Sequence, residues 1–398
     1  MRHTDIAIVG GGLAGSTAAA MLGRAGFDTV LVDPHAVYPV DLRCEKLDAG
    51  QVEIFRRTGL AEAVLKATTL GAEDWIARYG RLIEKRPSDQ HGIRYEDLVN
   101  SVRGEIPPGV PLILDKVAAI ANTPDRQQLT LAGGDQISAR LIVLANGLNS
   151  ALRRNFGMER EDISPCHSIT VGFDMTPVGR KAFPFGALTY YPERVGRMAY
   201  LTVFPVPGAM RANFMTYRDM NDPWLRRMRE TPMAALREEM PRLERLTGPF
   251  TVDGPVKIRP ADLYATTGYL QPGIVLVGDA FGTSCPAAGT GTTKVFTDVE
   301  RLCNVYIPRW LASDGMGLDK IAAFYDDPVK RAVDAACLAK AFRLRSLSTD
   351  RSLRWTATRL SRFAARATLA KLRQMRGSGR QPALTAGPLS HPKKPEAA

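Results

Sequence analysis

The chain has 398 residues, of which 45% are hydrophobic and 24% charged, the balance of a globular protein of two or three domains. Its five cysteines form no CxxC pair, which argues against a disulfide framework and a zinc site, and no apolar run approaches the roughly 20 residues that cross a bilayer. The net charge of +12 equals that of residues 340–398 alone, where 14 Lys and Arg face two acidic residues, so any membrane or polyanion partner is expected at the C-terminus.

A strand–helix–strand unit is predicted at the N-terminus. Residues 5–9 form an apolar run typical of a buried parallel strand, residues 16–25 are rich in good helix formers, and residues 29–32 form a second apolar run. No charged-then-apolar leader precedes the first strand, so we expect a cytoplasmic protein.

The turn after the first strand carries a GxGxxG motif. Gly10 permits the tight turn, Gly12 lets the backbone approach a pyrophosphate, and Gly15 lets the helix pack close to the strand. The first N–H groups of the helix, around Leu13 and Ala14, present a positive dipole end to the phosphates. In this context the motif predicts a dinucleotide site; a glycine turn without a ligand is the alternative.

Asp33 ends the second strand, where a carboxylate can accept hydrogen bonds from both hydroxyls of an adenosine ribose. This carboxylate argues against a 2′-phosphate, which would require an arginine nearby. The motif and Asp33 together leave NAD and FAD open.

The predicted secondary structure changes in the middle of the chain. Helices are predicted at residues 50–65 and 96–103, and short strands alternate with turns across residues 110–145. A β-rich block with many aromatic residues follows from 165 to 258, interrupted by a helical insert at 222–245. We expect this block to form a second domain built on a sheet.

An apolar strand at residues 273–277 returns the chain to the first domain and leads into Gly278-Asp279-Ala280, then Pro286, Gly289 and Gly291. A carboxylate at this strand end can accept from a ribityl hydroxyl, and the N–H groups of the glycine-rich loop can face the edge of a flavin ring. The spacing GDA-x5-P-x2-G-x-G resembles, without a gap, that of the single-component FAD-dependent aromatic hydroxylases, the family of p-hydroxybenzoate and ubiquinone-biosynthesis hydroxylases.

The resemblance implies an α/β fold with a Rossmann-like FAD-binding domain of the GR2 type, an inserted mixed β-sheet substrate domain and a C-terminal helical region. The expected FAD-binding domain covers residues 1–164, with some substrate-side strands at 70–95, and returns at 261–345. The substrate domain covers 165–260, and residues 346–398 form a basic tail, helical in part and disordered in part.

The resemblance also implies further cofactor contacts. It puts Arg43 near the pyrophosphate and the backbone of Val117 at the adenine, although a surface arginine and a core valine are the plain alternatives. The predicted cofactor residues are Gly10, Gly12, Leu13, Ala14, Gly15, Asp33, Arg43, Val117, Asp279, Gly291 and Thr292.

Several positions depart from the family pattern. The segment 145–153 resembles the DGxxSxxR fingerprint that is linked to both FAD and NAD(P)H, but Asn146 replaces its aspartate. Gly282 stands where histidine is frequent, Thr292-Thr293 replace the usual pair beside the flavin ring, and Tyr95 replaces a polar Arg or Gln. FAD binding tolerates these changes, whereas the choice of NADH or NADPH and the hydroxylation itself stay open.

The resemblance implies an FAD-dependent monooxygenase that uses NAD(P)H and O2 to hydroxylate a small aromatic or apolar metabolite. In such a reaction the protein positions the substrate and excludes water, so no nucleophile or general base is named. The loop containing Pro286, Gly289 and Gly291 would shape the oxygen pocket.

Alternatives to this function are an FAD-dependent reductase of the geranylgeranyl-reductase type and a membrane-tethered flavin-binding protein without oxygenase activity. Halogenation is disfavoured, because no two tryptophans are spaced as in the WxWxIP segment of flavin halogenases.

Four other side chains near these segments each have a functional and a structural interpretation. Cys285 is either a redox thiol or, as we favour, a packed small residue. His167, Tyr190 and Tyr191 either face the substrate or, more often for such residues, are structural.

The basic tail has two interpretations. Residues 353–375 form an imperfect amphipathic basic helix, which either lies at the inner membrane surface as a peripheral contact or is a solvated extension, and residues 377–398 are expected to be disordered. The neutral body carries no nucleic-acid-binding motif, so no nucleic-acid partner is expected, and the oligomeric state is left open.

Overall fold

The first predicted strand lies at the centre of a sheet. The computed structural model describes residues 1–43, 45–192 and 196–377. In this part of the chain a seven-stranded sheet has the order β8–β2–β1–β11–β10–β9, with β17 also paired to β11. Each neighbouring pair from β8 through β2 and β1 to β11 is parallel, and β17 is parallel to β11. The strand β10 is antiparallel to both β11 and β9. Its strands are β1 (Arg2–Val9), β2 (Thr29–Val32), β8 (Leu112–Ile113), β9 (Val117–Asn122), β10 (Gln127–Leu131), β11 (Gln136–Leu144) and β17 (Ile274–Leu276).

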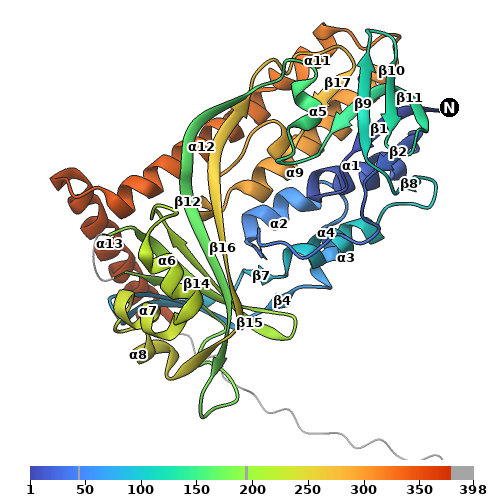
Figure 1. The fold of residues 1–398 in the computed structure, drawn as a ribbon. Coiled ribbons are helices and arrows are strands. Elements are labelled where there is room, and N and C mark those ends of the chain that lie inside the picture. Colours follow the sequence, from blue (N-terminus) through green and yellow to red (C-terminus); the bar gives the residue numbers. More distant parts are fainter. Residues whose placement is uncertain (44, 193–195, 378–398) are drawn as a thin grey trace, which may run out of the picture.

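Apolar layers cover both faces of this sheet, which explains why the run from Ile6 to Val9 is apolar at every position. The helix α1 packs on α4 and α9 at one face (Figure 1). The helices of this part are α1 (Leu13–Arg24), α2 (Ala49–Arg56), α3 (Ala61–Leu65), α4 (Tyr95–Gly104), α5 (Ala151–Arg154), α9 (Gly291–Arg301), α10 (Ile307–Leu311) and α11 (Leu318–Tyr325), with a π-helical turn at Leu302–Tyr306.

A second sheet, here called the substrate sheet, has seven strands in the described residues, in the order β16–β12–β15–β14–β13–β5–β6. Its strands are β5 (Glu73–Arg78), β6 (Arg81–Pro87), β12 (Arg160–Pro177), β13 (Ala187–Tyr191), β14 (Met198–Val206), β15 (Ala209–Thr216) and β16 (Phe250–Thr266). The helices α6 (Pro223–Glu230), α7 (Pro232–Glu239) and α8 (Glu244–Thr247) contribute to its apolar core. A small sheet of β3 (Lys46–Leu47), β7 (His91–Gly92) and β4 (Thr69–Leu70) lies between the two parts.

The two long strands β12 and β16 pair along nearly their whole length and run from the first sheet into the substrate sheet (Figure 1). The predicted division at residues 164/165 and 260/261 falls inside these strands and stays a prediction.

Some predicted elements differ from the structure. Within the run of short strands expected over residues 110–145, the apolar stretch 112–120, a single strand by its pattern, is two strands on opposite edges of the first sheet, because β8 pairs with β2 and β9 pairs with β10. The helix expected over 50–65 is broken into α2 and α3: α2 ends at Arg56, and the turn that follows ends at Gly59, which has a φ of +74°. The first helix begins at Leu13, three residues before the expected start, and the helical insert is three short helices.

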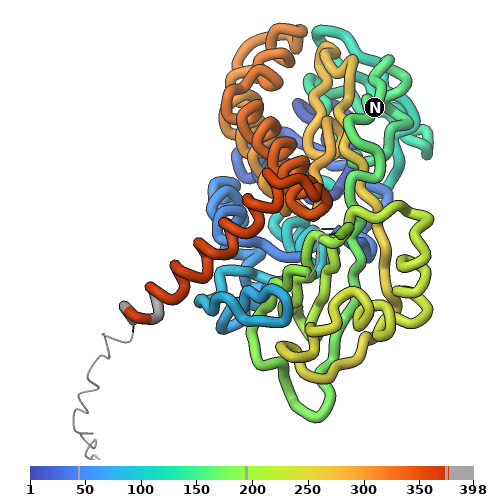
Figure 2. The backbone as a smooth tube through the Cα atoms, turned by 90° about the vertical axis from the view of Figure 1, so that its left-hand side faces the viewer, coloured from blue at the N-terminus to red at the C-terminus, as the bar shows by residue number. Residues whose placement is uncertain are grey.

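Two long helices follow at the C-terminus: α12 (Pro328–Thr349), which packs on α9 and β14, and α13 (Leu353–Gly377). The predicted amphipathic basic helix is α13; Arg366 in its C-terminal half lies 3.4 Å from Glu84 of β6, and its last turns extend past the body (Figure 2). Within the residues that the structure describes, we find no helix with the length and apolarity of a membrane span. The segment predicted to be disordered lies, after Gly377, outside the described residues.

Candidate active site

The β1–α1 turn has the geometry of a phosphate cradle. Gly10 has a φ of +102°, and a Cβ added there would lie 2.6 Å from the carbonyl oxygen of Ala145. A Cβ at Gly15 would lie 1.8 Å from the carbonyl oxygen of Gly10, so the helix packs on the turn only with glycine. At Gly12 a Cβ would face nearly open space. No described side chain caps α1, so its first N–H groups are available to an anion.

Asp33 closes one side of this cradle. Its Oδ2 accepts from the Gly11 N–H at 2.7 Å, and its Oδ1 accepts from the His35 N–H at 2.9 Å. Sequence reasoning took an arginine to be absent here, but Arg103 of α4 lies 3.1 Å from Oδ1 and also donates to the Gly11 carbonyl. Both side chains are nearly buried. Because the arginine is paired with the Asp33 carboxylate, it is not a free cation for a 2′-phosphate.

Arg43 and Asp279 are in direct contact although far apart in sequence. Arg43 Nη1 lies 2.6 Å from Asp279 Oδ2, and Arg43 Nε lies 2.7 Å from Asp41 Oδ2. Burial disfavours the charged guanidinium, but Tyr95 and the two carboxylates outweigh it, so the pKa of Arg43 is raised. Two residues predicted to contact one cofactor thus meet at one place.

That place is the wall of a cavity of about 280 Å³, here called the central cavity. Of the predicted residues, those that line it are Leu13, Arg43, Asp279, Pro286, Gly289, Gly291 and Thr292. The turn residues Gly10, Gly12, Ala14, Gly15 and Asp33 are not among the lining residues; of these, Ala14 lies close to the Gly278-Asp279 turn, since a Cβ at Gly278 would lie 3.4 Å from the Ala14 Cβ. Val117 begins β9 and packs against the apolar layer of the first sheet, outside the cavity lining, so its predicted contact with adenine stays a prediction.

The loop before α9 fits the edge of a polar ring. Gly289 has a φ of +63°, α9 begins at Gly291, and no described side chain caps it. The hydroxyls of Ser284 and Thr292 are buried without a hydrogen-bond partner among the described residues. Because an unpaired buried polar atom is costly, these hydroxyls and the helix N-terminus are the features that a flavin ring with its carbonyl oxygens would satisfy.

A buried network of charged side chains contacts the Gly278-Asp279 turn. Asp298 of α9 accepts from the Gly278 N–H at 3.2 Å and from Lys330 Nζ at 2.9 Å, and Lys294 Nζ lies 3.3 Å away. Asp334 pairs with Lys294 at 2.6 Å and with Lys330 at 2.9 Å. Sequence reasoning missed this network, because its members come from two helices.

The substrate sheet forms the opposite wall of the central cavity, with Tyr200 and Thr202 from β14 and Asn213 and Met215 from β15. The Tyr200 hydroxyl donates to the Ala287 carbonyl, which ties the wall to the loop. Burial holds the pKa of Tyr200 well above its usual value, so this group is a neutral donor.

Asn213 faces a buried carboxylate. Burial raises the pKa of Glu45, against the opposing effects of Arg211, 3.3 Å away, and of a hydrogen bond from Asn213. The Oδ1 of Asn213 has no partner among the described residues. The wall therefore offers an unused acceptor.

Three side chains considered as substrate contacts lie elsewhere. His167 packs on Phe342 of α12 with ring centroids 5.1 Å apart, Tyr190 is buried in the core of the substrate sheet, and Tyr191 lines a different cavity. Cys285 is 1% exposed, and burial raises the pKa of its thiol, which agrees with a packed residue.

Asn146, which replaces the fingerprint aspartate, has hydrogen-bond partners close in the sequence. Asn146 accepts from Arg153 at 3.2 Å and donates to the Asn149 carbonyl, so its amide replaces the family carboxylate within a closed turn. The charge of Arg153 acts on Tyr264, whose hydroxyl donates to the Asp279 carbonyl at 2.7 Å. The middle fingerprint is thereby connected to the Gly278-Asp279 turn.

Comparisons with known proteins agree with this geometry. Residues 3–96 match the family model described as FAD binding domain. The chain is 25% identical over 341 residues to 3-demethoxyubiquinol 3-hydroxylase of Escherichia coli (strain K12), covering 76% of this chain and 80% of the relative. It is 30% identical over 224 residues to 3-amino-4-hydroxybenzoate 2-monooxygenase PtnB3 of Streptomyces platensis, covering 51% of this chain and 57% of that relative. The structure of p-nitrophenol 4-monooxygenase PnpA from Pseudomonas putida DLL-E4 superimposes with a TM-score of 0.72 at 18% identity, covering 95% and 97% of the two chains, and so shares the fold.

Proposed function

Because this chain belongs to the FAD-dependent aromatic hydroxylase-like flavoproteins, we propose that it hydroxylates a small, electron-rich aromatic metabolite with O2 and NADH or NADPH. One oxygen atom would enter a ring C–H bond, the other would leave as water, and NAD(P)H would supply the two electrons. The observation that carries the proposal is the central cavity, where the predicted FAD contacts face a wall of the substrate sheet.

Bound FAD supplies the activation of oxygen, and the protein supplies binding and position. The N-terminus of α1 and Arg43 would hold the pyrophosphate, Asp33 the ribose and Asp279 the ribityl chain. The α9 N-terminus at Gly291 would meet the flavin ring. The loop around Pro286, closed by the Tyr200 hydroxyl, would keep water from the reacting ring.

The wall suggests how a substrate is oriented. The Oδ1 of Asn213 has no partner among the described residues, so a hydroxyl or amino substituent of the ring is the group that it would bind. Apolar contacts from Met215 would hold the ring itself. No general base is assigned.

The experiment is to purify the protein, record its flavin absorbance, and screen phenols, quinols and aminophenols for stimulated NADH and NADPH oxidation. Oxygen-dependent consumption coupled to a hydroxylated product supports the proposal. Turnover that proceeds unchanged without oxygen would instead identify a reductase, and tight FAD without substrate-stimulated flavin reduction would identify a binding protein.

We also propose that α13 contacts a membrane surface on the cytoplasmic side, which would bring the enzyme to an apolar substrate. The support is its mixture of arginines with exposed apolar residues, among them Leu353, Leu360 and Met375 at 88%, 59% and 64% exposure.

A further inference from the structure

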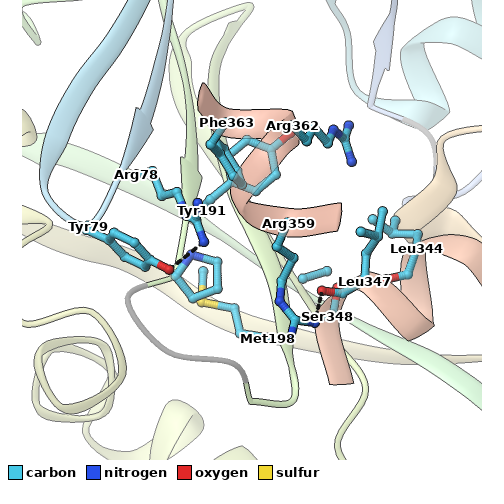
Figure 3. Close-up of a pocket in the computed structure, with 12 residues that line it drawn as sticks. Arg78, Tyr79, Tyr191, Met198, Leu344, Leu347, Ser348, Arg359, Arg362 and Phe363 are labelled. Carbon is cyan, nitrogen blue, oxygen red and sulfur yellow. Dashed lines mark hydrogen bonds between the residues drawn. The ribbon is translucent and has the colours of Figure 1, made fainter. Parts of the chain in front are cut away.

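A second cavity lies apart from the central cavity and shares no lining residue with it. It is enclosed by the ends of β5 and β13, the start of β14, the C-terminal turns of α12 and the first turns of α13 (Figure 3). Its volume is about 50 Å³. This exceeds the roughly 30 Å³ that one water molecule occupies in liquid water, and it is far below the roughly 300 Å³ or more of a pocket for a metabolite. Only a small ligand or a single chemical group fits.

Two nearly buried guanidinium groups line this cavity from opposite elements. Arg78 ends β5, Arg359 belongs to α13, and each is 8% exposed. Figure 3 shows Arg78 beside the Tyr79 hydroxyl, and its guanidinium carbon lies 3.8 Å from the ring centroid of Phe363. Of the five N–H donors of Arg78, one has a hydrogen-bond partner among the described residues.

Arg359 is held by neutral groups. Its Nη1 donates to the carbonyls of Leu347 and Asp350 at 3.1 and 2.7 Å, and its Nη2 donates to the Thr356 hydroxyl. These bonds fix the side chain at the junction of α12 and α13 without neutralising its charge.

Within the described part of the chain no carboxylate oxygen lies within 4 Å of either guanidinium, although hydrogen bonds from Ser352 and the charge of Arg359 lower the pKa of Asp350. The other buried arginines Arg103 and Arg211 pair with Asp33 and Glu45. Burial lowers the pKa of Arg78, and the charge of Arg359 lowers it further. Two like charges with little solvent are unfavourable unless an anion joins them.

We propose that this cavity binds one phosphate-class anion between Arg78 and Arg359. A tetrahedral anion presents oxygens in several directions and so can meet forks on two walls, whereas a carboxylate presents two oxygens in one plane. Arg362, an exposed arginine, lines the same cavity, whereas the Ser348 hydroxyl already donates to the Leu344 carbonyl at 2.8 Å. The anion is either free inorganic phosphate or the phosphodiester of an anionic lipid headgroup, and in both cases it joins α13 to the substrate sheet.

The first test is thermal unfolding of the full-length FAD-bound protein in inorganic phosphate and in chloride at equal ionic strength. We expect a saturable rise in Tm that is specific to phosphate. Arg78→Gln should abolish it, and this variant is expected to fold, since Arg78 hydrogen-bonds only its neighbour Tyr79. Arg354→Gln is the matched control, because Arg354 is an exposed arginine of α13 outside the cavity lining, and it should keep the full rise. If Arg78→Gln does not purify, Arg78→Lys decides: a rise smaller than in the unaltered protein supports the site, and an equal rise counts against it.

The second test separates the sources by flotation with vesicles of phosphatidylcholine, with and without phosphatidylglycerol. Loss of phosphatidylglycerol-dependent flotation in Arg78→Gln, but not in Arg309→Gln at an exposed arginine of α10 outside the cavity lining, assigns the lipid headgroup. Equal flotation of all three proteins, together with the phosphate-specific rise in Tm, assigns free phosphate. If neither the rise nor the flotation depends on Arg78, the inference is overturned.

Discussion

Replacing Lys330 by Met is the sharpest test of the charge network beneath the Gly278-Asp279 turn. Lys330 is 1% exposed, and its Nζ lies 2.9 Å from both Asp298 and Asp334. Methionine keeps the apolar stem and removes the charge. Breaking a buried ion pair from one side costs about 3–5 kcal/mol. Because Lys294 still reaches both carboxylates, we expect the lower end of that range, about 3 kcal/mol.

The same change should weaken FAD binding. Asp298 orients the Gly278 N–H, and its carboxylate is expected to shift when Lys330 is lost, which would displace the adjoining Asp279. A loss of about 1 kcal/mol in binding corresponds to roughly a fivefold rise in the FAD dissociation constant.

The assays are urea unfolding of the FAD-free protein and fluorescence titration with FAD. Lys340→Met, an exposed lysine on the same helix, is the control and should change neither quantity. An unfolding free energy for Lys330→Met within about 0.5 kcal/mol of the unaltered protein, the scale of a surface substitution, would refute the reasoning.

Four further outcomes are expected. Gly12→Val should leave the unfolding free energy nearly unchanged and block FAD binding, whereas Gly15→Val should destabilise the fold itself; equal effects in a melting assay would contradict this distinction. Asp279→Ala should weaken FAD binding by about 1–3 kcal/mol, the scale of a hydrogen bond to a charged group, and unchanged flavin affinity would argue against its predicted contact. Asn213→Ala should raise KM for the aromatic substrate with FAD affinity unaltered, measured by steady-state kinetics and flavin titration; a loss of flavin instead would mean that the wall supports the cofactor. Burial raises the pKa of Asp298 but its lysine partners outweigh this, so the folded-state pKa is lowered. Its stabilisation is thus complete above the unfolded value of about 3.9 and lost as the pH falls through the lower folded value, and acid unfolding curves with and without Asp298→Asn should converge there.

The turn and strand-end geometry of the predicted cofactor segments was predictable from sequence because each short segment has a geometric requirement. Gly10 and Gly15 are fixed by steric contacts within one turn, and Asp279 by its place at a strand end. The family resemblance implied that Arg43 and Asp279 serve one cofactor, but their direct contact was not predicted, since nothing local relates the two segments.

The parts that sequence reasoning missed depend on tertiary placement. Arg103 is an ordinary basic residue in the last turn of α4, and only the packing of α4 on α1 brings it to Asp33. Alternation along β14 indicates that Tyr200 and Thr202 share a face, but not which face meets the FAD part. Nothing in the sequence around Arg78 indicates that α13 covers its side chain.

The long pair of strands β12 and β16 has a consequence for how a substrate enters. The two strands are paired from Arg160–Thr266 to Pro177–Phe250, but the register shifts between Asp162 and Ser164, between Ser164 and Ser168, and between Gly172 and Asp174. A bulge bends a strand locally, so a movement of the substrate sheet against the cofactor part is expected to concentrate at these shifts. The paired segments on either side would move as rigid pieces, and the distance between the flavin and the substrate wall would change only by bending at the shifts.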